Sequence, residues 1–353
     1  MSAVSAQELP EDRSSAVIFS YSRIGEDYAP ETNLRTDQFL AQIDELSGGG
    51  YHVLSLPSLI DALDRGEILP PHSVVITFDG GYRSILEQAV PVLEARKLPF
   101  TIFFSSDMAD NGDTDYLEWA DLAKLSRNPL VTLGLHPAQY VRLSGFGDTE
   151  ILKQLNRGKV AYRNHLDKEP LYFAYPFGEY DGRYKDLVKT NGFRAALTQQ
   201  SGSAYGGSDF YALPRFTMTA AYGDIPHFRF VSTSLPLPAS NITPGVTDTG
   251  EELPLIGFNV SKPLEEELPK LSCFVSGQSR PEIEVLGETR VEVRLSSPVR
   301  FERTRVNCTL PATSVDDEGS DEMNDIRARW LGFLLTPPRG ESNAEDPTDL
   351  QTP

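Results

Sequence analysis

Short apolar runs alternate with longer segments of helical period from about residue 16 to residue 198, and this alternation restricts the fold more than any other feature. It is typical of consecutive βα units, in which helices pack on a mostly parallel sheet. Seven runs have the length and composition of buried strands, namely residues 16–21, 52–56, 74–78, 99–104, 131–135, 171–175 and 193–197. Four segments between them place apolar residues at helical spacing, namely 36–46, 83–96, 118–125 and 149–165. The periodicity fits a doubly wound open sheet and a barrel equally well.

The pattern changes after residue 210. Residues 234–254 are irregular and rich in Pro, which predicts a linker. Short alternating runs follow and predict a small all-β, sandwich-like domain: 255–260, 271–275, 288–295, 300–307 and 330–335. We therefore predict a disordered N-terminus (1–14), an α/β domain (15–233), a linker (234–254), a small β domain (255–336) with an acidic loop at 316–325, and a disordered acidic tail (337–353).

The chain carries 51 Asp and Glu against 32 Lys and Arg, which gives a formal net charge of −19 at pH 7. This charge repels phosphate backbones and anionic lipid surfaces, so nucleic acid and membrane are not expected partners. No stretch approaches the ~20 apolar residues that cross a bilayer. Residues 1–13 lack the apolar core of an export signal, which favours the cytoplasm for the chain as given. Cys273 and Cys308 are compatible with a disulfide, but two separate reduced thiols are the favoured interpretation in a chain without such a signal.

One predicted strand ends in a carboxylate. Residues 74–78 form a continuous apolar run, and Asp79 follows directly, before Gly80 and Gly81. Sites in barrels usually lie at the carboxyl ends of the strands, so Asp79 is a candidate catalytic residue. The alternative is structural, because an Asp before a glycine turn can cap the next helix. The two glycines indicate either a tight turn or a cradle of N–H groups for an anion.

The stretch Thr77-Phe78-Asp79-Gly80-Gly81 resembles the Thr-Phe-Asp-Asp-Gly signature of the polysaccharide deacetylases, the NodB homology family. Three further stretches extend the resemblance over about residues 15–215: Tyr-Ser-Arg-Ile-Gly-Glu at 21–26, Leu-Glu-Trp-Ala-Asp-Leu at 117–122 and Phe-Ala-Tyr-Pro-Phe-Gly at 173–178. The first and the last are similar to stretches of the branch of the family that acts on biofilm poly-N-acetylglucosamine, and the second is similar to the segment that leads into the family's second motif. The resemblance implies a distorted (β/α) barrel here. It also implies hydrolysis of the C–N bond of an acetamide group on a carbohydrate.

The resemblance implies roles for single residues as well. Asp79 stands where the family has its general base, and Arg215 stands in a Pro-Arg pair that orients this base. His136 matches the first imidazole of the family's His-Ser/Thr-x-x-His motif, which holds a divalent metal together with the second Asp of the first motif. Gly80 and Tyr140 replace the other two ligands. Because a hydrolytic metal normally has three protein ligands, we predict either no metal or a weakly bound zinc-like ion.

Aromatic residues near the same strand ends are candidates for contact with a sugar, although such residues at a barrel rim also pack on one another. Residues 173–180 resemble one wall of the family's substrate groove. The expected contacts are Tyr82, Tyr175, Pro176, Phe177 and Tyr180. The family's general acid, a His in a Leu-x-His motif, has no match in this chain. His227 is the candidate by chain position, with a packing role favoured.

Two hypotheses from different classes follow. In the first, the protein is a polysaccharide deacetylase-like protein that acts on or binds an N-acetylated polysaccharide or oligosaccharide, and the missing ligands impair its metal-dependent activity. In the second, it is a non-catalytic protein that uses the groove to bind a carbohydrate or a protein partner. A metal-free hydrolase is a third interpretation, for which the sequence offers no nucleophile with an evident base. The family's typical work outside the cytosol is the alternative to a cytoplasmic location.

Overall fold

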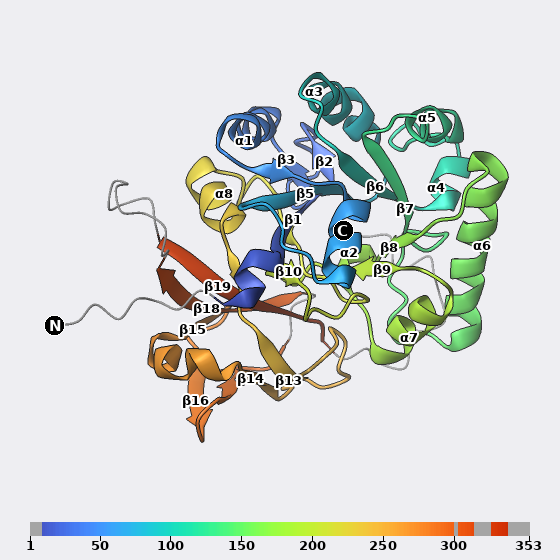
Figure 1. The fold of residues 1–353 in the computed structure, drawn as a ribbon. Coiled ribbons are helices and arrows are strands. Elements are labelled where there is room, and N and C mark those ends of the chain that lie inside the picture. The colour runs from blue at the N-terminus through green and yellow to red at the C-terminus, as the bar shows by residue number, and fades with distance from the viewer. Residues whose placement is uncertain (1–8, 300–302, 314–325, 338–353) are drawn as a thin grey trace.

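A nine-stranded sheet forms the centre of the larger domain (Figure 1). In this computed structural model, which describes residues 9–299, 303–313 and 326–337, its order is β10-β1-β5-β6-β7-β8-β9, with β4 beside β5 and β11 beside β1. The strands are Ser15–Tyr21 (β1), His52–Val53 (β4), Ser73–Phe78 (β5), Phe100–Phe104 (β6), Val131–Leu135 (β7), Tyr172–Ala174 (β8), Ala195–Leu197 (β9), Ser203–Tyr205 (β10) and Phe216–Thr217 (β11). All pairs are parallel except β1 with β10. The seven predicted strands are confirmed.

Residues 213–217 curl this sheet into a distorted barrel. Leu213 forms a parallel bridge with Leu197 at the end of β9, and Phe216 of β11 pairs with Phe19 of β1. One short segment therefore links the two edges of the parallel sheet. This settles the choice between an open sheet and a barrel that periodicity left open, and it agrees with the fold that the resemblance implied.

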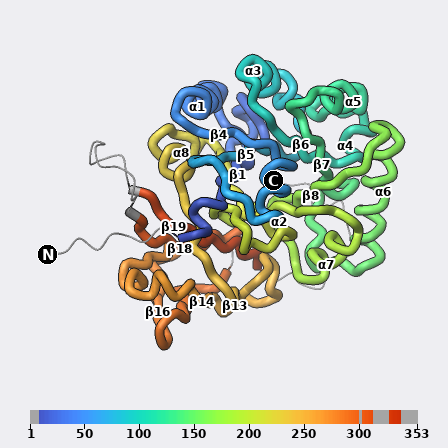
Figure 2. Tube along the Cα trace, viewed as in Figure 1, coloured from blue at the N-terminus to red at the C-terminus, as the bar shows by residue number. Residues whose placement is uncertain are grey.

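Helices surround the sheet on its outer side (Figures 1 and 2). They are Thr36–Gly48 (α1), Leu56–Arg65 (α2), Val90–Ala95 (α3), Ser106–Asp110 (α4), Trp119–Leu125 (α5), Asp148–Leu166 (α6), Gly182–Thr190 (α7) and Ile225–Ser232 (α8). The helix predicted at 83–96 is divided into a π-helical turn, Ile85–Ala89, and α3. Pro91 lies at the junction, where its missing N–H prevents a continuous α-helical ladder.

The smaller domain consists of two four-stranded sheets that share one apolar core. Their orders are β12-β19-β18-β15 and β13-β14-β17-β16. The strands are Leu235–Pro236 (β12), Ala239–Thr243 (β13), Ile256–Val260 (β14), Ser272–Val275 (β15), Glu282–Leu286 (β16), Arg290–Arg294 (β17), Thr304–Thr313 (β18) and Ile326–Leu335 (β19). The domain lies beside the barrel, in orange and red in Figure 1. We refer to it as the β domain.

Two predicted boundaries need correction. The linker expected at 234–254 contains β12, which pairs with β19, and β13, which pairs with β14. The N-terminal segment, expected to be disordered through residue 14, forms a 3-10 helix at Pro10–Ser14, and Leu9 is buried in the core of the β domain. The acidic loop expected at 316–325 and, apart from Pro337, the expected tail lie outside the described residues.

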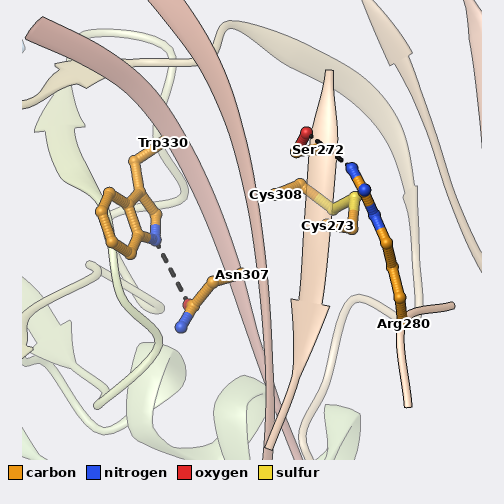
Figure 3. Close-up of a disulfide and its surroundings, with 6 residues drawn as sticks. All are labelled: Ser272, Cys273, Arg280, Asn307, Cys308 and Trp330. Atoms are coloured by element: carbon orange, nitrogen blue, oxygen red, sulfur yellow. Dashed lines mark hydrogen bonds between the residues drawn. A yellow bond between two sulfur atoms is a disulfide. The ribbon is translucent and has the colours of Figure 1, made fainter. Parts of the chain in front are cut away.

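Cys273 and Cys308 form a disulfide, so the preference for two separate thiols was wrong (Figure 3). Cys273 lies on β15 and Cys308 on β18, and the two residues are direct cross-strand partners with Cα atoms 4.0 Å apart. The bond staples one edge of a sheet whose other strands are held by backbone hydrogen bonds. No helix in the described part of the chain combines the length and the apolar character that a membrane span requires.

Candidate functional site

Asp79 lies at the carboxyl end of β5. That strand is buried at every position, and the N–H of Asp79 continues its ladder by donating to the carbonyl oxygen of Tyr21 at 2.8 Å. The carboxylate accepts two hydrogen bonds of 2.7 Å from Arg215, one on each oxygen. Ser20 Oγ and Gln199 Nε2 each donate to Oδ2 at 3.3 Å. Asp79 is 0% exposed, and its Oδ2 already accepts three bonds, so little of the carboxylate remains for a substrate.

Arg215 comes from the segment that closes the barrel. Its Nε donates to the carbonyl oxygen of Thr198 at 2.7 Å and its Nη1 to Thr77 Oγ1 at 3.0 Å, in addition to the bidentate pair with Asp79. Burial is the largest influence on the pKa of Asp79 and raises it, but the charge of Arg215, the neighbouring His136 and the hydrogen bonds from Arg215 and Gln199 together outweigh burial and hold this pKa below its ordinary value. Asp79 is therefore a buried, paired anion with a low affinity for a proton.

His136 follows β7 and lies beside Asp79 in the barrel. Its Nδ1 is 2.8 Å from the carbonyl oxygen of Ala174, and the backbone N–H of Gly80 donates to its Nε2 at 3.1 Å. These partners require a neutral ring with the proton on Nδ1. Burial lowers the pKa of His136 to about 4, in agreement with that state. Both ring nitrogens are thus engaged by the backbone of the barrel.

The residues at this position do not fit the family's metal. A Cβ at Gly80 would lie 2.3 Å from Cε2 of Tyr82, so the ring of Tyr82 fills the space where the side chain of a second Asp would start. Gly80 also has a φ of +94°, a backbone conformation that strains any residue with a side chain. Tyr140 stacks edge-on against His136 with ring centroids 4.7 Å apart, and burial raises the pKa of its phenol far above its ordinary value. Among the residues that the structure describes, no group of three or more His, Cys, Asp or Glu side chains could hold a metal ion.

A cavity of about 650 Å³ lies between the carboxyl-end face of the barrel and the β domain. Aromatic side chains form much of its wall on both sides. The barrel contributes Tyr82, Tyr140, Phe177, Gln199, Tyr222 and His227. The β domain contributes Phe274, Arg303, Arg305, Asn307 and Trp330. Asp79 and His136 are not part of this wall, but Gln199 and Tyr140 of the wall contact them directly, so the buried polar cluster lies just behind the cavity.

The five residues expected to contact a sugar are placed differently. Tyr82 and Phe177 line the cavity. Tyr175 is buried and its hydroxyl donates to the carbonyl oxygen of Tyr211 at 3.0 Å. Pro176 is buried, and Tyr180 is buried with its hydroxyl 3.3 Å from the carbonyl oxygen of Gly245. Only Tyr82 and Phe177 of this set reach the cavity.

Several residues of the site were not singled out from the sequence. Gln199 contacts Asp79 and also lines the cavity, and its position two residues after β9 is a strand-end signal of the same kind as that of Asp79. Arg303 and Arg305 stand two residues apart at the start of a predicted strand, a spacing that places them on one face. His227, in contrast, was the candidate general acid by chain position; it lies in the cavity wall beside Tyr222, and burial lowers its pKa.

Residues 67–196 match the family model for polysaccharide deacetylase. The poly-beta-1,6-N-acetyl-D-glucosamine N-deacetylase of Escherichia coli is 23% identical over 252 residues, which cover 59% of this chain and 37% of the relative. The enzyme of the same name from Staphylococcus epidermidis is 25% identical over 198 residues, 52% of this chain and 68% of the relative. The chain thus spans little more than a third of the Escherichia coli protein.

Solved structures of deacetylases share the fold. A Streptococcus pyogenes deacetylase, PplD, in complex with acetate has a TM-score of 0.55 at 18% identity, over 59% of this chain and 94% of that one. IcaB from Ammonifex degensii has a TM-score of 0.54 at 22% identity, over 63% of this chain and 98% of that one. At these identities the likeness shows the fold alone.

Proposed function

We propose that the barrel of this chain belongs to the polysaccharide deacetylase family, and that the protein binds an N-acetylated polysaccharide or oligosaccharide in the cavity at the carboxyl-end face while its metal-dependent hydrolysis is impaired. The observation that carries the proposal is the hydrogen bond from the Gly80 N–H to Nε2 of His136. Nε2 carries the lone pair that a metal would need, and the backbone N–H of Gly80 already occupies this lone pair. The carboxylate oxygens of Asp79 are likewise occupied, because both accept hydrogen bonds from Arg215.

Unlike the metal position, the cavity has features that support binding of a carbohydrate. Its volume is in the range of small-ligand sites, and its wall combines aromatic rings with a few polar groups. Phe177 has a φ of +60°, a backbone region that is uncommon for a bulky residue and that concentrates at functional sites. Its ring lies below the guanidinium groups of Arg142 and Arg303, at 5.1 Å and 5.6 Å from its centroid. We assign Tyr82 and Phe177 to the ligand and give Tyr175, Pro176 and Tyr180 a supporting role behind them.

The disulfide bears on the location of the protein. Disulfides persist mainly in oxidising compartments, and a buried cross-strand pair such as Cys273 and Cys308 would otherwise stay reduced. We therefore place the protein outside the cytosol, in line with the family's typical work and against the cytoplasmic location favoured by the N-terminal sequence.

Metal content and turnover test the proposal. Protein purified without chelators is loaded with zinc, cobalt or nickel, analysed for bound metal, and assayed for acetate release from N-acetylglucosamine oligomers. We expect substoichiometric metal, no acetate above the blank, and saturable binding of the oligomers in calorimetry. One metal per chain with turnover would contradict the impaired hydrolysis, and absence of any binding would contradict the carbohydrate ligand.

A restored site gives the matching control. Gly80→Asp with Tyr140→His supplies two ligands, but the new Cβ at position 80 meets the Tyr82 ring. We expect this double variant to gain little metal affinity and the triple variant that adds Tyr82→Ala to gain more, because the space for the carboxylate is then open, although the φ of +94° at position 80 and the bond from its N–H to His136 still limit the gain. Equal affinities of the double and triple variants would show that Tyr82 is not the obstacle.

A further inference from the structure

Two arginines of the β domain face the cavity. Arg303 immediately precedes β18 and Arg305 lies on it, and both side chains line the wall opposite the barrel. Nη1 of Arg305 donates to the backbone carbonyl oxygen of Gln199 at 2.6 Å. Nη1 of Arg303 is 3.5 Å from Oε1 of the same residue. We call Arg303 and Arg305 the arginine pair.

The arginine pair has no acidic partner within the described residues, whereas most other described arginines form ion pairs with Asp or Glu. This is notable in a chain with 51 acidic and 32 basic residues. Glu31, exposed at the rim of the cavity, is the acidic residue in the described wall, and it makes no ion pair with either arginine. Each guanidinium has five N–H donors, of which one is used here, so most donors of the arginine pair remain available.

Electrostatics favour an anion at this position. Burial and the neighbouring charge of Arg303 lower the pKa of Arg305 to about 10, which still leaves Arg305 cationic at neutral pH. Two half-buried like charges repel each other, and an anion between them would replace the repulsion by charge-assisted hydrogen bonds. Planar guanidinium groups suit the oxygens of a carboxylate or phosphate, which they bind in bidentate geometry.

The rest of the wall suits a sugar. Trp330 Nε1 donates to Oδ1 of Asn307 at 3.2 Å, and this bond fixes the orientation of the amide (Figure 3). The NH₂ group of Asn307 has no partner among the described residues and is a donor for a hydroxyl or carbonyl oxygen. The exposed rings of Tyr222 on the barrel side and Phe274 on the β-domain side provide flat apolar faces. A ring with hydroxyl groups and one anionic substituent matches this combination.

We propose that the arginine pair binds the anionic group of a sugar, a carboxylate as in a hexuronic acid or a phosphate ester as in a sugar phosphate, so that the ligand of the cavity is an acidic carbohydrate. The inference rests on the proposed function for the location of the carbohydrate and adds the chemical class. It makes the β domain part of the binding site, because both arginines belong to it.

Calorimetry on the full chain tests the inference with four probes: glucuronic acid, glucose 6-phosphate, neutral N-acetylglucosamine and inorganic phosphate. We expect at least one anionic sugar to bind tenfold or more tightly than the neutral sugar. The stronger of the two identifies carboxylate or phosphate as the source of the charge. Equal affinity of inorganic phosphate and glucose 6-phosphate would overturn the carbohydrate part, and no preference for any anion would overturn the inference.

Substitutions localise the effect. Arg303→Gln with Arg305→Gln should weaken the anionic sugar at least tenfold and neutral N-acetylglucosamine less than twofold. Because Arg305 also holds the Gln199 backbone, Arg303→Gln alone provides a variant that leaves this contact intact. Arg294→Gln, in an exposed ion pair with Glu284 on the other sheet, is the matched control and should change neither affinity. Unchanged binding of the anionic sugar to both arginine variants would overturn the assignment.

The results also separate this inference from the proposed function. Binding of neutral N-acetylated sugars without preference for an anionic sugar would support the proposed function and contradict the inference of an acidic ligand. The opposite result is tight binding of an anionic sugar, lost in the arginine variants, together with no binding of N-acetylated sugars. It would support the role of the arginine pair and contradict the proposal of an N-acetylated ligand.

Discussion

The buried pair of Asp79 and Arg215 determines what the barrel interior can do. Its position could be predicted, because Asp79 follows an apolar run and Arg215 stands in a Pro-Arg pair that resembles the family pattern. The sequence could not predict that the carboxylate of Asp79 is already occupied by hydrogen bonds from other side chains. The partners lie 136 residues apart, and the closing segment that brings them together is too short to be recognised as a strand. The same limit applies to Tyr82, whose ring fills the space beside Gly80 only in the folded chain.

Removal of Arg215 is expected to destabilise the protein strongly. Arg215→Met leaves the carboxylate of Asp79 buried without its counter-charge, which should cost about 3–5 kcal/mol of unfolding free energy. Adding Asp79→Asn removes the stranded charge and should recover part of the loss. Urea unfolding measures both. The control is Arg194→Met in the exposed pair with Asp61, where a loss below about 1 kcal/mol is expected. Equal losses at the two sites would mean that the buried pair is not special.

His136 should give the protein an acid-sensitive stability. Burial lowers its pKa from 6.5 to about 4, so between these values the unfolded chain takes up a proton that the folded chain does not. Stability from this residue is therefore fully present above pH 6.5 and is lost as the pH falls toward 4. From pH 7 to pH 5 the loss should be about 2 kcal/mol.

Urea unfolding of His136→Gln at the same two pH values isolates this contribution, since a glutamine does not titrate. The variant should lose about 2 kcal/mol less than the unmodified protein over this interval. His52→Gln, at an exposed position, serves as the control and should retain the original dependence on pH. A parallel pH dependence in the unmodified protein and in His136→Gln would show that the imidazole is not held neutral by the fold.

At the scale of elements, strands were easier to predict than connections. The seven predicted strands of the barrel sheet and the five predicted strands of the β domain are present, because each contains an apolar or alternating run, whereas β10, β11 and β16 were not predicted. The connection after α8 was misread as a linker. It contains β12, which has two residues, and β13, whose alternation is hidden by polar residues. Pro236 is compatible with β12 because that strand lies at the edge of its sheet.

The disulfide shows why pairing of elements decides side-chain chemistry. The sequence places Cys273 and Cys308 on two predicted strands but does not say that these strands are neighbours. Once β15 pairs with β18 in the observed register, the two cysteines are opposite each other. A shift of one residue would turn one of the two side chains to the other face of the sheet.

At the scale of the whole molecule, the barrel and the β domain are joined by more than a covalent connection. Trp330 of β19 packs on Phe216 and Phe230 of the barrel domain, with ring centroids 5.1 Å and 6.0 Å apart. Gly202 forms an antiparallel bridge with Leu331. At the other end of the chain, Asp12 pairs with Arg329, which is almost fully buried. The cavity is formed only where both domains meet, so its existence depends on this interface.

The two tryptophans allow this coupling to be tested. Trp119 lies in the barrel domain, where it stacks on His165 with centroids 4.2 Å apart, and Trp330 lies in the β domain. Trp330→Phe therefore leaves a fluorescent reporter of the barrel, and Trp119→Phe leaves a reporter of the β domain. In each variant we expect the urea transition measured by tryptophan fluorescence to coincide with the transition measured by circular dichroism. Coincidence in both variants is the behaviour of a single cooperative unit.

The same reporters test the cavity, because a ligand that contacts both domains stabilises only the state in which they are assembled. The dissociation constant is measured on each variant, since Trp330→Phe removes the hydrogen bond that fixes Asn307 in the cavity wall. A saturating anionic sugar should move both transitions to higher urea by the same amount, at a ligand excess that the dissociation constant predicts. A shift confined to the Trp119 reporter would mean that the ligand binds the barrel alone, and the arginines of the β domain would then have no part in holding it.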